Sequence, residues 1–271
     1  MKTVSWGPSA PAVAKLFLTG ATVGPIVDSL HNQCLLEYHK APISVGWPIA
    51  LAHLDLDGAL FSSSWTVPPL LGIAYVVLGG ILPRLFQLLI DATSQSTVGE
   101  RVKDASQSTG SLRTRAVVAV TTTALIIKLS AYLETHSDIT ASLPIEGVAE
   151  QHIAVLLLAA LLQWATLDGT LAALLAASIT SIGGPLSELP FVAYGFWEYL
   201  SQAGDYLPLQ HVSAGSDIWK SLLGNDYQHL ALSSLTGPCY FAVTMDAIAL
   251  SRWFDSSSSE EDKETSSNTE T

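Results

Sequence analysis

The chain of 271 residues is poor in charged side chains and in cysteine. Only 13% of its residues are charged, whereas soluble domains have about 25%, so a soluble globule would lack the polar surface that it needs. Two cysteines are too few for a disulfide framework. A net charge of −12 excludes a basic nucleic-acid-binding surface. Because 49% of the residues are hydrophobic, most of the chain is not disordered, and the composition indicates a membrane protein.

Long apolar segments supply the spans that this composition implies. A spanning helix needs about 20 predominantly apolar residues. Six segments meet this condition, at residues 11–30, 67–90, 116–133, 148–167, 169–189 and 230–250. Lys2 and Lys15 flank a first segment without a cleavage site, so it is predicted to be a retained span rather than a signal peptide. The sequence predicts an all-α, polytopic membrane protein with six transmembrane helices.

The distribution of lysine and arginine predicts the orientation of these spans. With the N-terminus in the cytosol, nine of the twelve basic residues fall in cytosolic stretches: Lys2, Lys15, Arg84, Arg101, Lys103, Arg113, Arg115, Arg252 and Lys263. Lys40 and Lys220 fall on the opposite side, and Lys128 lies within a span. By the positive-inside rule, both termini are predicted to be cytosolic.

The last residues have a different composition from the rest of the chain. Residues 255–271 are rich in Ser, Thr and Glu and contain no apolar residue, which predicts a disordered acidic cytosolic tail after a membrane domain of residues 1–254. Ser256–Ser259 precede acidic residues at 260–262. This run fits either a solvating tail or a site for an acid-directed kinase.

Three charged residues lie within or near the predicted spans, where charge is costly. They are Asp28, Lys128 and Asp246. Three interpretations remain open: an ion or proton pathway, a buried ion pair, and side chains that extend to the membrane interface. Their spread over different depths does not favour a relay, although a small transporter built on them is an alternative function.

Catalytic, cofactor and metal motifs are missing from the sequence. It has no nucleophile elbow, zinc-protease motif, phosphate-binding loop or dinucleotide fingerprint. His53, Asp55 and Asp57 alternate in one loop, but no second cluster stands at metal-ligand spacing. Cys34 and Cys239 are expected to be buried thiols. Nothing requires an enzyme or a cofactor.

Two helix-breaking features and one aromatic run carry structural predictions. Ser62–Ser64 before Pro68 and Pro69 predict a hydroxyl-capped entry into the second span. The run Gly183-Gly184-Pro185 predicts a kink late in the fifth span, either beside a lipid-accessible pocket or as a packing irregularity. The aromatic residues after the fifth span predict an interfacial belt or a contact ledge: Phe191, Tyr194, Phe196, Trp197 and Tyr199.

Three motifs resemble those of the Insig family of endoplasmic-reticulum membrane proteins. The run Phe61-Ser-Ser-Ser-Trp65-Thr-Val-Pro68-Pro69 is similar to the family's Phe-Ser-Ser-Ala-Trp-Trp-Val-Pro-Pro. Trp164-Ala-Thr-Leu-Asp168 is similar to its Trp-Trp-Thr-Phe-Asp. Gly237-Pro-Cys239-Tyr-Phe-Ala, followed by Thr244-Met245, resembles a run in its sixth helix. The resemblance covers most of the chain and implies the same six-span topology.

This resemblance implies a non-catalytic, sterol-responsive membrane regulator. Its ligand would be a sterol or oxysterol, and its partners would be sterol-sensing-domain proteins such as a Scap-type escort and HMG-CoA reductase. Gln151 stands 17 residues before Asp168, at the spacing of the family's sterol-contacting Gln, and Leu125 and Trp65 are its implied companions at the sterol site. Asp168 would support partner binding, cap the next helix, or do both.

The chain departs from the family after this aspartate, where Gly169-Thr170-Leu171 replaces the family's Arg-Ser-Arg. A charged cytosolic contact is therefore lost. A bound lipid other than an oxysterol remains open, as does a different partner protein.

Overall fold

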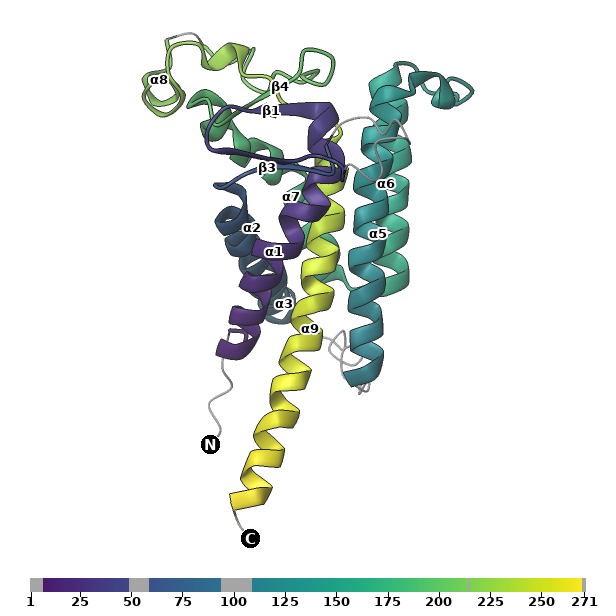
Figure 1. The fold of residues 1–271 in the computed structure, drawn as a ribbon, viewed down its shortest axis with the longest axis vertical. Helices are drawn as coiled ribbons and strands as arrows, with labels where there is room; N and C mark the ends of the chain where they lie inside the picture. The colour runs from purple at the N-terminus through teal and green to yellow at the C-terminus, as the bar shows by residue number, and fades with distance from the viewer. Residues whose placement is uncertain (1–6, 49–58, 94–108, 214, 270–271) are drawn as a thin grey trace.

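The computed structural model describes residues 7–48, 59–93, 109–213 and 215–269. The run of His53, Asp55 and Asp57 lies outside these ranges. In Figure 1, long helices stand side by side, and the strands and the short helix α8 (Asp217–Leu223) gather at one end, which we name the capped end. The start of α1 (Ala10–Leu35) and the end of α9 (Thr236–Thr269) point to the opposite end.

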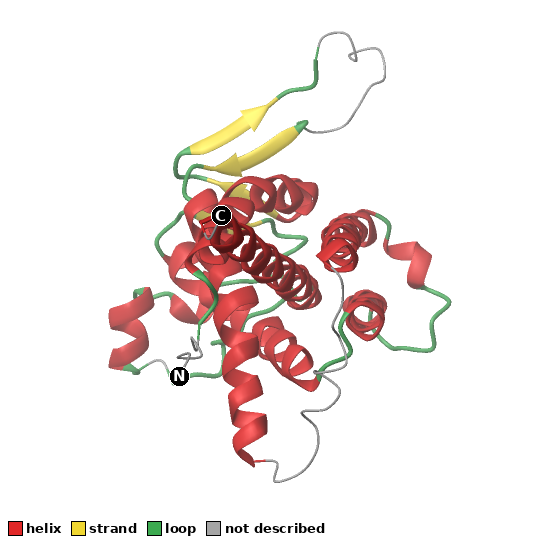
Figure 2. Ribbon diagram, turned by 90° about the horizontal axis from the view of Figure 1, so that it is seen from below, coloured by secondary structure: helices red, strands yellow, loops and turns green. Residues whose placement is uncertain are grey.

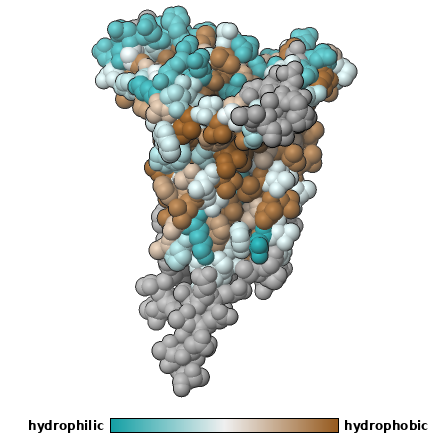
Figure 3. All heavy atoms as spheres, in the orientation of Figure 1, coloured by the Kyte–Doolittle hydropathy of each residue, from teal (hydrophilic) through white to brown (hydrophobic). Residues whose placement is uncertain are grey.

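Five helical segments are long and apolar enough to cross a membrane. They are α1, the continuous run Val67–Thr93, Ser111–Thr135 within α5 (Thr109–Thr135), α6 (Val148–Leu167) and α7 (Leu171–Ala193). The predicted bounds 148–167 coincide with α6. Figure 3 shows hydrophobic residues over the helices and hydrophilic residues gathered at the capped end. This distribution matches a lipid-facing band beside a water-facing end.

The sixth segment, α9, falls outside these five candidates although it has the most central position. It packs against α1, α5, α6, α7 and the π-helix η2 (Val76–Ile81). In Figure 2, which looks at the bundle from below, the C-terminal end of α9 is drawn in front of the other helices. A helix enclosed by protein does not need an apolar lipid-facing surface, which explains how α9 carries the fully buried Asp246 and several hydroxyl side chains.

The entry into the second span differs from its prediction. Phe61–Ser64 forms strand β3, and Thr66 precedes α2 (Val67–Tyr75) without a side-chain cap hydrogen bond. Ser64 Oγ instead donates to the carbonyl of Lys40, 2.7 Å away. Prolines do occupy the first turn as predicted, because their missing N–H has no helical partner there.

The π-helix η2 joins α2 to α3 (Leu82–Thr93) and packs closely on α9. A Cβ atom at Gly79 would lie 2.2 Å from the carbonyl oxygen of Ala247. Only a residue without a side chain allows the two backbones to approach this closely. Gly79 therefore fixes the second span against the central helix.

Short strands correct the all-α prediction to a mostly helical fold. Strand β1 (Leu36–Tyr38) pairs antiparallel with β4 (Trp197–Tyr199), and β2 (Pro42–Val45) pairs with β3. The 3-10 helices η3 (Ser137–Thr140) and η4 (Tyr227–His229) complete the capped end with α8. Strands β1 and β4 join segments about 160 residues apart, and the strands lie at the capped end of the helices.

The predicted aromatic belt is mostly a core of this capped end. Trp197 and Tyr199 are buried, and the ring of Trp197 stacks on that of Phe191 with centroids 4.9 Å apart. Tyr194 is the member that is exposed, at 57%. Strand pairing turns these rings inward, which the sequence pattern alone does not reveal.

Helix α9 continues to Thr269 and so enters the segment for which the composition predicts a tail. Asp255 accepts hydrogen bonds from the backbone nitrogen and the hydroxyl of Ser9, both at 3.1 Å, and pairs with Arg84. Ser258 is buried and donates to the carbonyl of Phe254. These contacts hold the helix beyond residue 254, where composition predicted disorder.

Basic residues gather at the end opposite the cap, which we name the basic end. Arg252 Nη1 lies 2.5 Å from Asp168 Oδ2, Arg84 pairs with Asp255, and Arg115 donates to the carbonyl of Leu167 at 3.4 Å. The exposed Lys40 and Lys220 belong to the capped end. Among the bases that the structure describes, these groups lie at opposite ends of the bundle, as the charge count predicted.

Candidate ligand cavity

A cavity of about 220 Å³ lies between α1, α2, α7 and α9 and reaches the strands of the capped end. Much of its wall is apolar, with side chains from α1, α2, α9 and also α5: Val27, Val67, Leu70, Leu71, Val243 and Ile127. Pockets of this kind, apolar with a few convergent polar groups, are typical small-molecule sites.

Asp28 on α1 supplies the first carboxyl group of the cavity. Its Oδ2 accepts hydrogen bonds from Asn32 Nδ2 and from the Tyr38 hydroxyl, which is 3.3 Å away. Asn32 also donates to the Tyr38 oxygen at 2.6 Å. Helical spacing places Asn32 one turn after Asp28, and β1 brings Tyr38 back over both residues.

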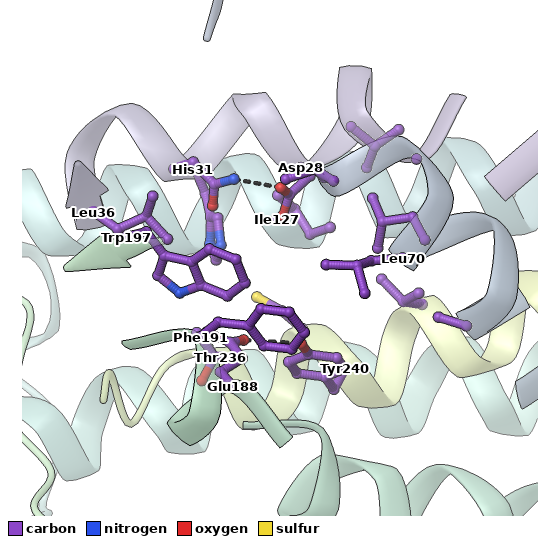
Figure 4. Close-up of a pocket in the computed structure, with 18 of the residues that line it drawn as sticks. Asp28, His31, Leu36, Leu70, Ile127, Glu188, Phe191, Trp197, Thr236 and Tyr240 are labelled. Carbon is purple, nitrogen blue, oxygen red and sulfur yellow. Dashed lines mark hydrogen bonds between the residues drawn. The ribbon is translucent and has the colours of Figure 1, made fainter. Parts of the chain in front are cut away.

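Glu188 on α7 supplies the second carboxyl group, on the opposite side of the cavity in Figure 4. Its Oε1 accepts from the Tyr240 hydroxyl at 2.8 Å and its Oε2 from the Tyr199 hydroxyl at 2.6 Å. Tyr240 belongs to α9 and Tyr199 to β4. Three elements therefore converge on one carboxyl group.

The predicted break at Gly183-Gly184-Pro185 becomes a packing site within a continuous α7. A Cβ atom at Gly184 would lie 2.4 Å from the ring of Tyr240. The glycine therefore makes room for the ring whose hydroxyl reaches Glu188, one turn further along α7. The pocket-side interpretation of this motif agrees with the position of the cavity beside Ser187 and Glu188.

Two of the phenols lie outside the spans, and their environment keeps them protonated. Burial, followed by repulsion from Asp28 and Glu188, raises the pKa of Tyr38 above its ordinary value. Burial and then Glu188 raise the pKa of Tyr199 in the same direction. Because both phenols keep their protons at neutral pH, they serve as hydrogen-bond donors to the carboxyl groups.

Two further polar side chains face the cavity with different partners. His31 Nδ1 lies 3.0 Å from Ser130 Oγ on α5. Trp197 is 7% exposed, and its Nε1 is buried without a hydrogen-bond partner among the described residues. The cavity therefore offers an indole N–H as well as carboxyl oxygens.

The three charged residues predicted within the spans do not come together. Asp28 lines the cavity, whereas Asp246 lies behind Tyr75, whose hydroxyl donates to Asp246 Oδ2 at 3.2 Å. Lys128 is exposed on α5, and no ion pair among the described residues joins it to an acid. The arrangement does not form the single aqueous path that a transporter built on these three residues requires.

The structure places the predicted sterol residues away from this cavity. Gln151 is 8% exposed near the start of α6, where its Nε2 donates to the carbonyl of Ile145 at 2.7 Å and its Oε1 has no described partner. Leu125 on α5 and Trp65 before α2 are 64% and 70% exposed. None of the three lines the cavity.

Asp168, the predicted partner-binding residue, is occupied by contacts within the chain. Its side chain is 4% exposed and pairs with Arg252. Its Oδ1 accepts from the backbone nitrogen of Thr170 at 3.0 Å and from the Thr170 hydroxyl. Thr170 is itself the N-cap of α7, so Asp168 supports the helix start and ties the α6–α7 turn to α9.

Glu188 and its phenols were missed as site residues. Glu188 is an acidic residue near the end of a strongly apolar segment, three positions after Pro185, and this offered a signal. Tyr199 and Tyr240 offered none, because only the fold brings them to Glu188. Among the described residues, no group of three or more acidic, histidine or cysteine side chains is arranged to hold a metal ion.

The helices and the cavity define a polytopic membrane protein with a mainly apolar pocket between its helices. No protein-family profile and no curated protein sequence matches the chain. Among solved structures, the chain is similar to MvINS, an Insig homolog from Mycobacterium vanbaalenii, with a TM-score of 0.53 and 17% identity over 90% of this chain and 94% of that one.

A cross-linked cysteine variant of MvINS, solved as a trimer, gives the same TM-score of 0.53, 18% identity and the same coverage. The chain therefore has an Insig-like fold, in agreement with the three sequence motifs. At this level of identity the likeness concerns the fold.

Proposed function

We propose that the chain is a non-catalytic membrane regulator that binds a sterol or a related lipid in its cavity and docks other membrane proteins. The observation that carries this proposal is a cavity with mainly apolar walls and a few polar groups, formed between helices of an Insig-like fold. Such a site suits a ligand with an apolar body and a small polar head.

The finer topology is part of the proposal. We place α9 as a sixth span, because it packs against all five candidate spans, and we place both termini in the cytosol. The gathering of arginines at the basic end supports this orientation. A location in the endoplasmic-reticulum membrane rests on the sequence resemblance alone.

Two positions compete for the sterol. The first is the cavity between the helices. The second is the position to which the sequence resemblance points, Gln151 with Leu125 and Trp65. The buried Oε1 of Gln151 has no donor among the described residues, so it is able to accept a hydrogen bond from a sterol hydroxyl. We propose the cavity as the principal site, because Leu125 and Trp65 are exposed on the outer surface.

The proposed partners are sterol-sensing-domain proteins such as a Scap-type escort and HMG-CoA reductase. Asp168 would act on them indirectly, since its carboxylate is used by Arg252 and Thr170. Loss of this carboxylate would free the α6–α7 turn from α9 and alter the surface at the basic end. The departure at Gly169-Thr170-Leu171 leaves the partner's identity to experiment.

Photo-labelling tests the ligand part of the proposal. The purified full chain should be labelled by a photo-crosslinkable sterol, and unlabelled oxysterol should compete. Labelling that no sterol competes would contradict sterol binding. Gln151→Ala should leave labelling of the cavity peptides unchanged, and a general loss would move the site to α6.

Co-purification tests the docking part. Asp168→Ala should reduce recovery of a co-expressed sterol-sensing-domain protein, while the matched change Asp217→Ala at the exposed start of α8 should not. Equal recovery with wild type and Asp168→Ala would confine Asp168 to a structural role.

A further inference from the structure

We infer that the acidic groups of the cavity select an amphipathic ligand with a cationic amine head group. This rests on the proposed function, in which the cavity holds a lipid, and it adds the chemistry of the head. Three observations support it. They are the charged residues of the wall, a carboxyl oxygen without a hydrogen-bond partner among the described residues, and the aromatic rings that line the cavity.

The wall carries two acidic groups and no lysine or arginine. Asp28 and Glu188 face the cavity from α1 and α7, and neither takes part in an ion pair among the described residues. Their hydrogen bonds come from phenols and an amide, which bring no positive charge. A desolvated carboxylate without a cation is costly, and an ammonium group would supply that cation.

One carboxyl oxygen is free to receive such a head group. Both hydrogen bonds to Asp28 go to Oδ2, which leaves Oδ1 without a described partner. Glu188 has a phenol on each of its oxygens. We therefore assign Asp28 as the direct contact of the ammonium and Glu188 as the second acidic group across the cavity (Figure 4).

Aromatic rings complete the surroundings of the proposed head group. Six of the lining residues are aromatic: Tyr38, Tyr75, Phe191, Trp197, Tyr199 and Tyr240. The Tyr38 ring meets Trp197 edge-on at a centroid distance of 6.2 Å, beside the stacked pair of Trp197 and Phe191. Ring faces attract ammonium groups, so the rings add to the attraction of the carboxylates.

A neutral alcohol is the competitor that the experiment must address. Its hydroxyl would donate to Asp28 Oδ1 and accept from the buried indole N–H of Trp197. It would leave both acidic groups without a counter-charge, which favours the amine. An anionic head, such as a carboxylate or phosphate, would add a third negative group and is expected to be excluded.

A matched pair of ligands tests the inference with the full chain in maltoside micelles. A photo-crosslinkable sterol alcohol serves as tracer, and the competitors are one sterol carrying either a 3β-amino or a 3β-hydroxyl group. The amine should compete about tenfold more strongly, the effect of about 1.4 kcal/mol from one charge contact. Asp28→Asn should abolish this preference, Glu188→Gln should reduce it, and Glu37→Gln should keep it, because Glu37 is exposed between two lining residues.

The possible results separate the inference from the proposed function. Equal or stronger competition by the alcohol with wild-type protein would overturn the amine inference and leave lipid binding intact. Competition by neither sterol would overturn both. If Asp28→Asn fails to give a monodisperse protein, the wild-type comparison of the two sterols still decides the question.

Discussion

The two ends of the bundle surround their acidic groups in different ways. At the basic end, Asp168 and Asp255 pair with Arg252 and Arg84. Near the capped end, Asp28 and Glu188 receive hydrogen bonds from neutral phenols and an amide. The first arrangement is complete within the chain, whereas the second leaves two acidic groups without a cation beside a cavity.

This difference separates structural acids from those available to a ligand. The arginine pairs connect α9 with the α6–α7 turn and with the second span, and so they fix helix ends. The phenols hold the cavity carboxyls in place without covering Asp28 Oδ1. The following predictions test this contrast, beginning with the largest expected effect.

Removal of Arg252 should cost the most stability. Arg252→Ala leaves Asp168, which is 4% exposed, without its charged partner. We expect a loss of about 2 kcal/mol, within the range for hydrogen bonds to charged groups, measured by unfolding of the purified protein in mixed micelles. Lys220→Ala at the capped end serves as the exposed control. Unchanged stability in Arg252→Ala would refute a structural role for this pair.

Removal of one phenol from Glu188 should cost less. Tyr199→Phe and Tyr240→Phe each delete one hydroxyl, for an expected loss of about 1 kcal/mol in the same unfolding measurement. Tyr194→Phe is the matched control, because Tyr194 is 57% exposed. If either variant lost as much unfolding free energy as Arg252→Ala, the acidic groups at the two ends would not differ in how they are stabilised.

Salt should have the smallest effect on stability, and this effect should come from the basic end. The side chains of Arg84 and Asp255 are 30% and 28% exposed, so ions reach this pair. Raising the salt from 0.1 M to 1 M shortens the screening length from about 10 Å to about 3 Å. Wild type should lose a few tenths of a kcal/mol more than Asp255→Asn. The salt response of Tyr199→Phe should equal that of wild type, and a difference would show ionic coupling at the cavity.

The sequence predicted the features that depend on local composition. Apolar runs located the spans, and the predicted bounds 148–167 match those of α6. The basic residues indicated which helix ends lie together. The three short motifs led to the Insig-like fold, although most of the sequence has diverged.

Features that depend on contacts between distant segments were not predictable. The pairing of Tyr38 with Trp197 joins two three-residue strands that have no strong local signal. The same pairing buries aromatic rings that would otherwise suggest an interfacial belt. Glu188 became a site residue only when Tyr199 and Tyr240 were brought to it. In the same way, Asp255 meets Ser9 from the other end of the chain.

The most direct test of the central claim is to map where a photo-crosslinkable sterol attaches to the full chain by mass spectrometry. The cavity account predicts labelled peptides from α1, α7 and α9, and loss of this labelling in Leu70→Trp, which places an indole in the cavity. Leu162→Trp on the outer face of α6, where Leu162 is 56% exposed, should have no effect. Labelling confined to α5 and α6 around Leu125 and Gln151, and unaffected by Leu70→Trp, would contradict the account.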